Sequence, residues 1–160
     1  MPRLDDFDRK LLDLVQRDAT LTGEEMADRI GLSASAVQRR LKRLQAEGAI
    51  ASIVALVDPA KTGRPSFFIV GLEVERERAD LLARLRAWLS AEESVQQAFY
   101  VTGAWDFILV VTAPDVERYD SLMSRLLADN PNVRRFTTNV VLGSHKRGLF
   151  VPVLEGGSSD

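Results

Sequence analysis

The stretch that decides the fold of this chain is residues 22–48, TGEEMADRIGLSASAVQRRLKRLQAEG. It predicts two short helices that meet at Gly31, a residue type that suits the left-handed conformation at the end of a helix. Thr22 and Glu25 have the spacing of a capping box at the start of the first helix. Ser33 offers a side-chain oxygen to the free amide groups at the start of the second. The pattern is a helix, a tight turn and another helix.

The second of these helices, from Ser33 to Gly48, separates apolar from polar side chains. Val37, Leu41 and Leu44 recur at spacings of three and four residues, so they share one face. Ser, Gln, Arg and Lys cover the rest, and these residue types contact bases and phosphates in a DNA major groove. We predict that double-stranded DNA is contacted by Ser33, Ser35, Gln38, Arg39, Arg40, Lys42 and Arg43. The alternative is a helical bundle whose basic face is only solvated.

An earlier helix, expected over residues 6–17, completes a three-helix core. Its apolar side chains are Phe7, Leu11, Leu12, Leu14 and Val15. Arg40 lies nearer the buried stripe than the other cations, which also allows it to pair with an acid of this first helix, such as Asp8.

The formal net charge of −2 argues weakly against DNA binding, but the distribution of charge matters more than the sum. Residues 33–48 carry four cations and one acid, whereas the first helix is rich in aspartate. A modest basic patch on an acidic protein fits a sequence-specific DNA-binding protein better than a general nucleic-acid coat.

Composition excludes several kinds of site. The chain has no cysteine, which rules out disulfides and thiolate metal sites, and its single histidine, His145, rules out histidine-rich metal centres. We predict no catalytic residue, no metal and no cofactor, and hence no enzymatic activity. The acidic start lacks the apolar core of a signal peptide, and no apolar run is long enough to span a bilayer. A cytoplasmic protein is expected.

The second half of the sequence predicts alternating strands and helices. The expected strands are residues 67–75, 95–102, 107–112 and 133–142, and the expected helices are residues 76–91 and 115–129. This β-α-β-β-α-β order predicts a ferredoxin-like fold, in which both helices cover one face of a four-stranded antiparallel sheet. The chain is therefore expected to be an α+β protein. The predicted division is a helix-turn-helix DNA-binding domain over 1–49, a hinge strand and linker over 50–65, a ferredoxin-like effector-binding and oligomerisation domain over 66–153, and a disordered tail over 154–160.

The predicted helices leave one face of the sheet open. Residues 107–111, FILVV, are apolar at every position, and residues 67–70, FFIV, are similar. A sheet with one wet face alternates apolar and polar residues, so here both faces require burial. Self-association through the open face satisfies this requirement, and closed two-fold dimers are the commonest form. The alternative is a monomer whose linker or tail covers the sheet.

The chain resembles the Lrp/AsnC family of feast/famine transcriptional regulators. The matching segments are LDDFDRKLL at 4–12, GLSASAVQRRL at 31–41, GAI at 48–50, Asp58-Pro59 with Gly63, TGAWD at 102–106 and the strand at 138–142. The resemblance implies an N-terminal helix-turn-helix, a strand-bearing hinge, a C-terminal ligand-sensing domain and a response to an amino acid. It also implies a homodimer that assembles further, to an octamer or a related ring. Two departures are Trp105, where the family commonly has tyrosine, and Phe136, where it often has a small polar residue.

The turn at residues 102–106 is the second candidate site. Gly103 lets the backbone turn sharply and expose amides that can hold a carboxylate, and Asp106 could pair with an ammonium group. The resemblance implies an effector pocket here, between subunits. The effector-binding candidates are Tyr100, Thr102, Gly103, Ala104, Trp105, Asp106, Thr137, Thr138 and Asn139. The alternatives are a hairpin with a polar tip, and strand residues whose hydroxyl and amide groups are satisfied locally.

These features together favour a DNA-binding regulator that is switched by a small amino acid or related metabolite. One alternative is an architectural DNA-binding protein without an effector. Another is a ferredoxin-like enzyme with an accessory helical domain, which the sequence disfavours because no cluster of carboxylates, lysines or hydroxyls stands out.

Overall fold

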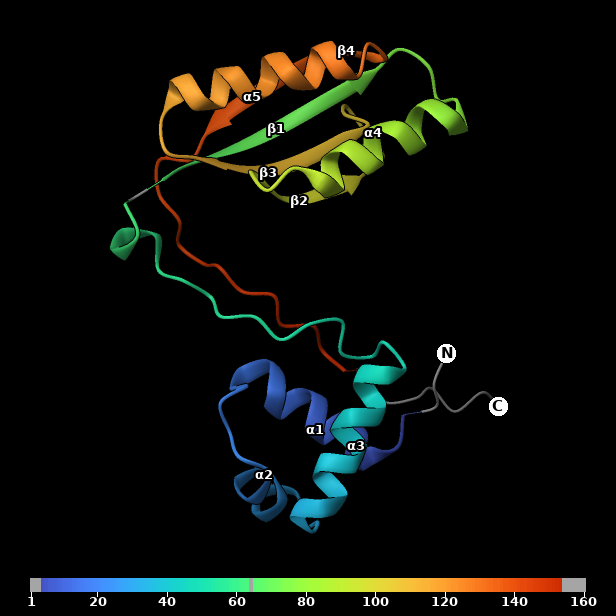
Figure 1. Cartoon of the computed structure of the whole chain (residues 1–160), viewed down its shortest axis with the longest axis vertical. Coiled ribbons are helices and arrows are strands. Elements are labelled where there is room, and N and C mark those ends of the chain that lie inside the picture. The colour runs from blue at the N-terminus through green and yellow to red at the C-terminus, as the bar shows by residue number, and fades with distance from the viewer. Residues whose placement is uncertain (1–3, 64, 154–160) are drawn as a thin grey trace. The chain divides into compact units, whose positions relative to one another are not determined.

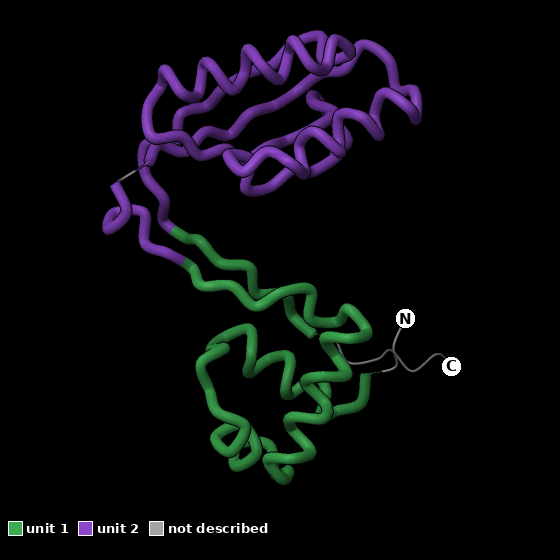
Figure 2. Tube along the Cα trace, viewed as in Figure 1, with its two compact units in different colours: residues 1–56, 146–160 green, residues 57–145 purple. Residues whose placement is uncertain are grey.

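The computed structural model describes residues 4–63 and 65–153. The chain divides into two compact units, coloured separately in Figure 2. The first comprises Met1–Leu56 together with Lys146–Asp160, and the second is Val57–His145. The expected tail at 154–160 lies outside the described residues.

The first unit contains three helices, α1 (Asp6–Arg17), α2 (Gly23–Ile30) and α3 (Ala34–Ala46). The predicted capping box of α2 is present, since the Glu25 backbone N–H donates to the Thr22 hydroxyl and the Thr22 N–H donates to the Glu25 carboxylate. Gly31 ends α2 with φ +76°, in the left-handed region where glycine is favoured. Ser33 caps α3 by accepting from the Ala36 N–H at 3.3 Å. These short-range contacts form the helix-turn-helix.

A small apolar core holds the three helices together. Leu11, Met26, Ala27 and Val37 are buried in one cluster, and Leu14 packs against it. Leu44 is also completely buried, near the end of α3. Because Val37 and Leu44 lie on the same stripe of α3, their burial determines which side of that helix is left to solvent.

The C-terminal segment of the first unit is attached to α1 by two reciprocal hydrogen bonds. The Gln16 amide donates to the Val151 carbonyl at 3.1 Å and accepts from the Val151 N–H at 2.8 Å. The Arg17 guanidinium lies 4.5 Å from the centre of the Phe150 ring. The expected second domain extended to 153, but residues 146–153 are grouped with the helical unit, and sequence spacing does not indicate the contacts of Phe150 and Val151 with α1.

The linker differs from the expected hinge strand. Residues 51–58 have no regular secondary structure, and a short 3₁₀ helix follows at Pro59–Lys61. Ile53, Val54 and Leu56 are all exposed. The segment is rich in strand-forming residues, but a strand also requires hydrogen bonds to a neighbouring backbone, and no such bond joins residues 51–57 to another described segment.

The second unit has the predicted ferredoxin-like arrangement. Its elements are β1 (Ser66–Val74), α4 (Ala79–Ala91), β2 (Val95–Tyr100), β3 (Phe107–Ala113), α5 (Val116–Asp129) and β4 (Val133–Val140). The strands lie in the order β2-β3-β1-β4, and every pairing is antiparallel. Figure 1 shows α4 and α5 on the same side of this sheet. The α+β fold class predicted from the sequence is therefore confirmed.

Helix α4 starts three residues later than predicted. Arg76 is held in the loop after β1, because its N–H donates to the Asn132 side chain and its carbonyl accepts from the same amide. The Glu75 N–H donates to the Asn132 carbonyl. These bonds hold the backbone before Arg78, which is the residue that precedes the helix.

The sheet has one face covered by the helices and one that is not. On the covered face Phe68, Val70, Leu109 and Val111 are buried, and the Phe68 ring stacks on Tyr119 of α5 with centroids 3.9 Å apart. The other face carries a row of half-buried apolar side chains that neither α4 nor α5 covers. Its apolar residues are Phe67, Ile69, Ile108 and Val110, with Phe99 exposed at the β2 end. We call these five residues the open sheet face.

No helix in the described part of the chain is long and apolar enough to cross a membrane.

Candidate nucleic-acid interface and effector loop

The exposed side of α3 presents four polar residues that make no ion pair with the described residues. Ser35, Gln38, Arg39 and Lys42 are all exposed on a helix whose opposite side is anchored by buried core residues. Because the backbone of this helix is already ordered, only the side chains lose conformational entropy when they bind. We call these four residues the α3 polar face. Hydrogen-bond donors and acceptors of this kind, with two cations, have the chemistry to contact base edges and phosphates.

Two of the predicted DNA-contacting arginines instead face α1. Arg40 Nη1 lies 2.7 Å from Asp5 Oδ2 and 2.8 Å from Asp8 Oδ1, which is the pairing that the sequence allowed as an alternative. Arg43 Nη2 lies 2.5 Å from Asp8 Oδ2. Helical periodicity placed Arg43 on the far side of α3, but its long side chain reaches back to the buried carboxylate. Arg40 and Arg43 are therefore not part of the α3 polar face.

These contacts shift the pKa values of Arg40 and Asp5. Hydrogen bonds to Asp5 and Asp8 raise the pKa of Arg40. Partial burial alone would raise the pKa of Asp5, but the hydrogen bond from the Asp8 N–H and the Arg40 guanidinium outweigh it and hold that pKa below its ordinary value. Both groups are therefore charged at neutral pH, and the contact between α1 and α3 is ionic.

The Ser33 hydroxyl also makes hydrogen bonds within the fold. It accepts the Ala36 N–H and lies 3.2 Å from the Ser35 hydroxyl. Its predicted contact with DNA therefore competes with its role at the start of α3.

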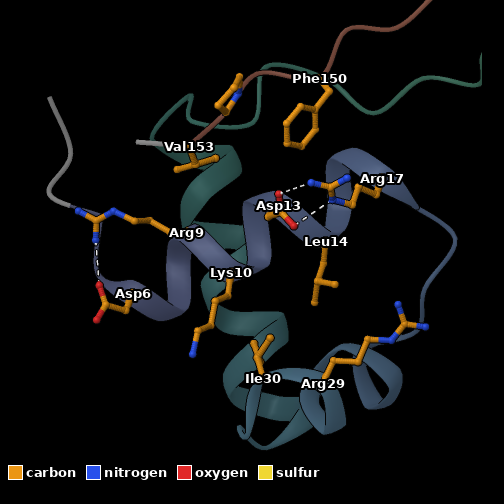
Figure 3. A pocket seen from close by; sticks show the side chains of 11 residues that line it. Asp6, Arg9, Lys10, Asp13, Leu14, Arg17, Arg29, Ile30, Phe150 and Val153 are labelled. Atoms are coloured by element: carbon orange, nitrogen blue, oxygen red, sulfur yellow. Dashed lines mark hydrogen bonds and ion pairs between the residues drawn. The ribbon is translucent and has the colours of Figure 1, made fainter. Parts of the chain in front are cut away.

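A groove on the helical unit lies between α1, α2 and the C-terminal segment. It has a volume of about 980 Å³ and is lined by residues that include Lys10, Arg29 and Phe150. Figure 3 shows that the two acids in it, Asp6 and Asp13, are paired with arginines of the same helix. The sequence did not indicate this groove, because it depends on the docking of the segment around Val151.

The turn at residues 102–106 is built by backbone bonds and by one carboxylate. The Val101 N–H donates to the Asp106 carbonyl, and the Asp106 N–H donates to the Leu72 carbonyl, both at 2.9 Å. Asp106 Oδ2 also accepts the Val74 N–H at 2.7 Å, where β1 leaves its regular register with β4. Asp106 therefore joins the turn to β1. Gly103 is exposed and has φ +122°, so a larger residue would be strained there.

Trp105 lies over the sheet at Gly71 of β1. A Cβ atom at Gly71 would be 2.5 Å from the indole ring, so only glycine leaves room for it. The Arg135 guanidinium lies 5.9 Å from the ring centre and is paired with Glu73. The indole therefore occupies part of the face that the helices leave uncovered.

The remaining effector-binding candidates divide between the two faces of the sheet. Thr137 and Asn139 pair with Gly71 and Ile69, so they lie on the uncovered side with Trp105. Thr138 lies on the helix side, where its hydroxyl is 2.5 Å from the Tyr119 hydroxyl, and Tyr100 pairs with Phe107 on that side too. Strand side chains alternate, so neighbouring residues cannot serve one pocket on one face. The Thr138 hydroxyl therefore has a hydrogen-bond partner within the fold, which is the alternative that the sequence left open for these strand residues.

Two domain families match this chain, the AsnC-type helix-turn-helix domain over residues 4–45 and the Lrp/AsnC ligand binding domain over residues 68–149. An HTH-type transcriptional regulator of Sinorhizobium fredii is 43% identical over 150 residues, covering 94% of this chain and 89% of the relative. This chain belongs to the Lrp/AsnC family of transcriptional regulators.

Solved structures of the Lrp/AsnC family agree with the fold described above. An AsnC family transcriptional regulator from Agrobacterium tumefaciens superposes with a TM-score of 0.83 at 28% identity, covering 93% of this chain and 97% of that one. A transcriptional regulator from Neisseria meningitidis, solved as a complex with L-Met, has a TM-score of 0.82 at 25% identity, covering 94% and 97% of the two chains.

Sequence reasoning missed two contributors to the sites of this Lrp/AsnC regulator. Gly71 is needed beneath Trp105, and a lone glycine in a strand pattern was the available signal for a close approach. Asp5 pairs with Arg40 beside Asp8. The sequence could indicate that Asp5 caps α1, but it could not indicate that Arg40 of α3 is the partner of Asp5.

Proposed function

We propose that this Lrp/AsnC regulator binds DNA in a sequence-specific manner as a homodimer or higher oligomer, and that a small amino acid or related metabolite changes its affinity for DNA. The observation that supports this most directly is the α3 polar face. It combines two exposed cations, which contact phosphates, with Ser35 and Gln38, which can contact base edges. Opposite this face, Val37 and Leu44 anchor the helix in the core, so the side chains are presented from a fixed support.

Dimerisation is supported by the open sheet face. Neither α4 nor α5 covers the five apolar residues of this face, and a second copy related by a two-fold axis would bury them. Two α3 helices would then favour an approximately palindromic operator with half-sites a helical turn, or a multiple of one, apart. The family resemblance also suggests that the dimers assemble further, to an octamer.

The effector proposal centres on the turn at residues 102–106 and on Trp105. Exposed backbone at Gly103 offers N–H groups to a carboxylate, and Asp106 offers negative charge to an ammonium group. The indole over Gly71 favours a compact or apolar ligand side chain over a long charged one. The Neisseria meningitidis relative, which is bound to L-Met, supports an amino acid as the class of ligand.

Two measurements test the proposed function. The first is the affinity of the protein for a duplex that it selects from a random-sequence pool, at two salt concentrations, with a scrambled duplex as the control. The second is the same titration with each of the twenty amino acids added. A change of about 1–3 kcal/mol in DNA affinity is expected for the effector. Selective DNA binding without an effect of any amino acid would instead support an architectural protein.

Asp106→Asn should separate ligand binding from folding at the turn. Asparagine retains an oxygen that accepts the Val74 N–H but removes the charge that would pair with an ammonium group. We expect calorimetry to show weaker amino-acid binding with little change in melting temperature. Asp106→Ala is the matched control, because it removes the acceptor as well and should cost about 1–3 kcal/mol of stability. Equal ligand affinity in wild type and Asp106→Asn would contradict this assignment.

A further inference from the structure

Asp8 is a buried acid in a unit proposed to bind a polyanion. Its side chain is 1% exposed, and both carboxylate oxygens are occupied. Oδ1 is 2.8 Å from Arg40, while Oδ2 is 2.5 Å from Arg43 and accepts the Asp5 N–H at 3.1 Å. A buried carboxylate requires such partners, because an uncompensated charge in the interior is strongly unfavourable.

The two arginines are consequently not equivalent to the other two cations of α3. The charge of Arg40 and Arg43 is already compensated by a buried carboxylate, and the nitrogens that hold it, Arg40 Nη1 and Arg43 Nη2, could contact a phosphate only by leaving an oxygen that water cannot easily solvate. Arg40 is additionally held by Asp5 at 2.7 Å. Arg39 and Lys42 have no ion-pair partner among the described residues and can meet a phosphate without breaking a contact. Intramolecular acids thus compete with DNA for half of the positive charge on this helix.

We propose that Asp8 is a specificity-determining residue, which limits non-specific DNA binding by holding Arg40 and Arg43 away from the phosphates. Arg39 and Lys42 are then the cations of α3 that contact DNA. This inference rests on the proposed function, since it concerns how that function discriminates between sequences. Phosphate contacts strengthen binding to every duplex alike, whereas base contacts distinguish them. Withholding two phosphate contacts therefore raises the ratio of specific to non-specific affinity.

The salt dependence of binding measures how many cations meet phosphates. Each phosphate neutralised on B-DNA contributes about −0.9 to the slope of log affinity against log salt concentration. The first test compares Lys42→Gln with Arg43→Gln on the selected duplex. Lys42→Gln should make the slope shallower by about 1, and Arg43→Gln should leave it unchanged. An Arg43→Gln slope that is shallower than the wild-type slope by about 1 would overturn the proposal.

The second test is Asp8→Asn, which keeps an oxygen for the Asp5 N–H but removes the carboxylate that holds Arg43, and leaves Arg40 held by Asp5 alone. The slope should steepen by up to about 2, which corresponds to an affinity that falls about tenfold more between 50 and 200 mM salt. Affinity for the scrambled duplex at low salt should rise, and the ratio of selected to scrambled affinity should fall. Asp13→Asn is the matched control, because Asp13 pairs with Arg17 of the same helix, as Figure 3 shows, and should alter none of these quantities.

The outcomes separate the proposal from a purely structural role and from failure of the proposed function. If Asp8 only stabilises the fold, Asp8→Asn lowers affinity for both duplexes and leaves the slope unchanged, which overturns the proposal. If Asp8→Asn does not fold, as judged by circular dichroism, the comparison of Lys42→Gln with Arg43→Gln decides. Wild-type protein that binds no duplex would contradict the proposed function itself. If the wild type binds the selected duplex but Arg43→Gln makes the salt dependence shallower by about 1, only this inference is contradicted.

Discussion

Val110→Glu is expected to break the proposed dimer and leave a monomer. Val110 lies in β3 on the open sheet face, opposite Ile69 of β1. In a two-fold dimer formed through this face, glutamate would place unpaired carboxylates from both copies in an apolar interface. Burying such charges, and bringing like charges together, costs several kcal/mol. Light scattering at micromolar concentration should therefore give the mass of one chain for the variant and at least two for the wild type.

Val116→Glu is the matched control for this substitution. Val116 is an exposed valine at the start of α5, away from the open sheet face, and an acidic residue is favourable in the first turn of a helix. It should remain dimeric. Because two DNA-binding units on one particle gain from effective concentration, Val110→Glu should also weaken binding to a two-half-site operator about 100-fold or more. A folded Val110→Glu protein that remains dimeric would show that the subunits associate elsewhere.

Arg39→Ala is expected to weaken binding to the selected duplex by about 1–3 kcal/mol. Arg39 is exposed on the α3 polar face and has no ion pair with the described residues. Its removal takes away the proposed DNA contact and breaks no hydrogen bond or ion pair with the described residues, so the melting temperature should stay within experimental error. The change in affinity is measured by titration of the labelled duplex.

Comparison of duplexes distinguishes the kind of contact that Arg39 makes. If it contacts a base edge, the loss should be confined to sequences that keep that base pair, whereas a phosphate contact should weaken binding to all sequences. Unchanged affinity in a folded Arg39→Ala protein would remove this residue from the interface.

Much of the fold followed from residues that are close together in the sequence. The caps at Thr22 and Ser33, and the left-handed Gly31, depend on hydrogen bonds and sterics within one turn of chain, so they could be predicted from residue types and spacing. Strand and helix order in the second unit was also predictable, because periodicity of apolar residues is a local pattern. The boundary of α4 was not, since Asn132, from a loop far along the chain, holds the residues before it.

The candidate sites also contain features that could be predicted from local sequence and features that could not. Exposure of Ser35, Gln38, Arg39 and Lys42 was predictable from helical geometry, because the buried stripe of α3 determines the opposite side. The partner of Arg43 was not predictable in this way, because a long side chain can turn back toward a carboxylate on another helix. Likewise the family resemblance grouped Thr138 with the effector loop, but its side chain lies against Tyr119 on the other face of the sheet.

By itself, the sequence determined the helix-turn-helix, the β-α-β-β-α-β order, the apolar sheet face and the family, because each depends on local spacing or on the order of segments. Only the tertiary structure decided which cations of α3 remain available, that Asp106 joins its turn to Val74, and that Gln16 holds the segment around Val151. It also left residues 51–58 without strand structure despite their composition. The physical reason is common to all four. Each of these ion pairs, side-chain acceptors and strand ladders needs a partner that lies far away in the sequence, and the local pattern of residues does not indicate which distant residue the fold brings into contact.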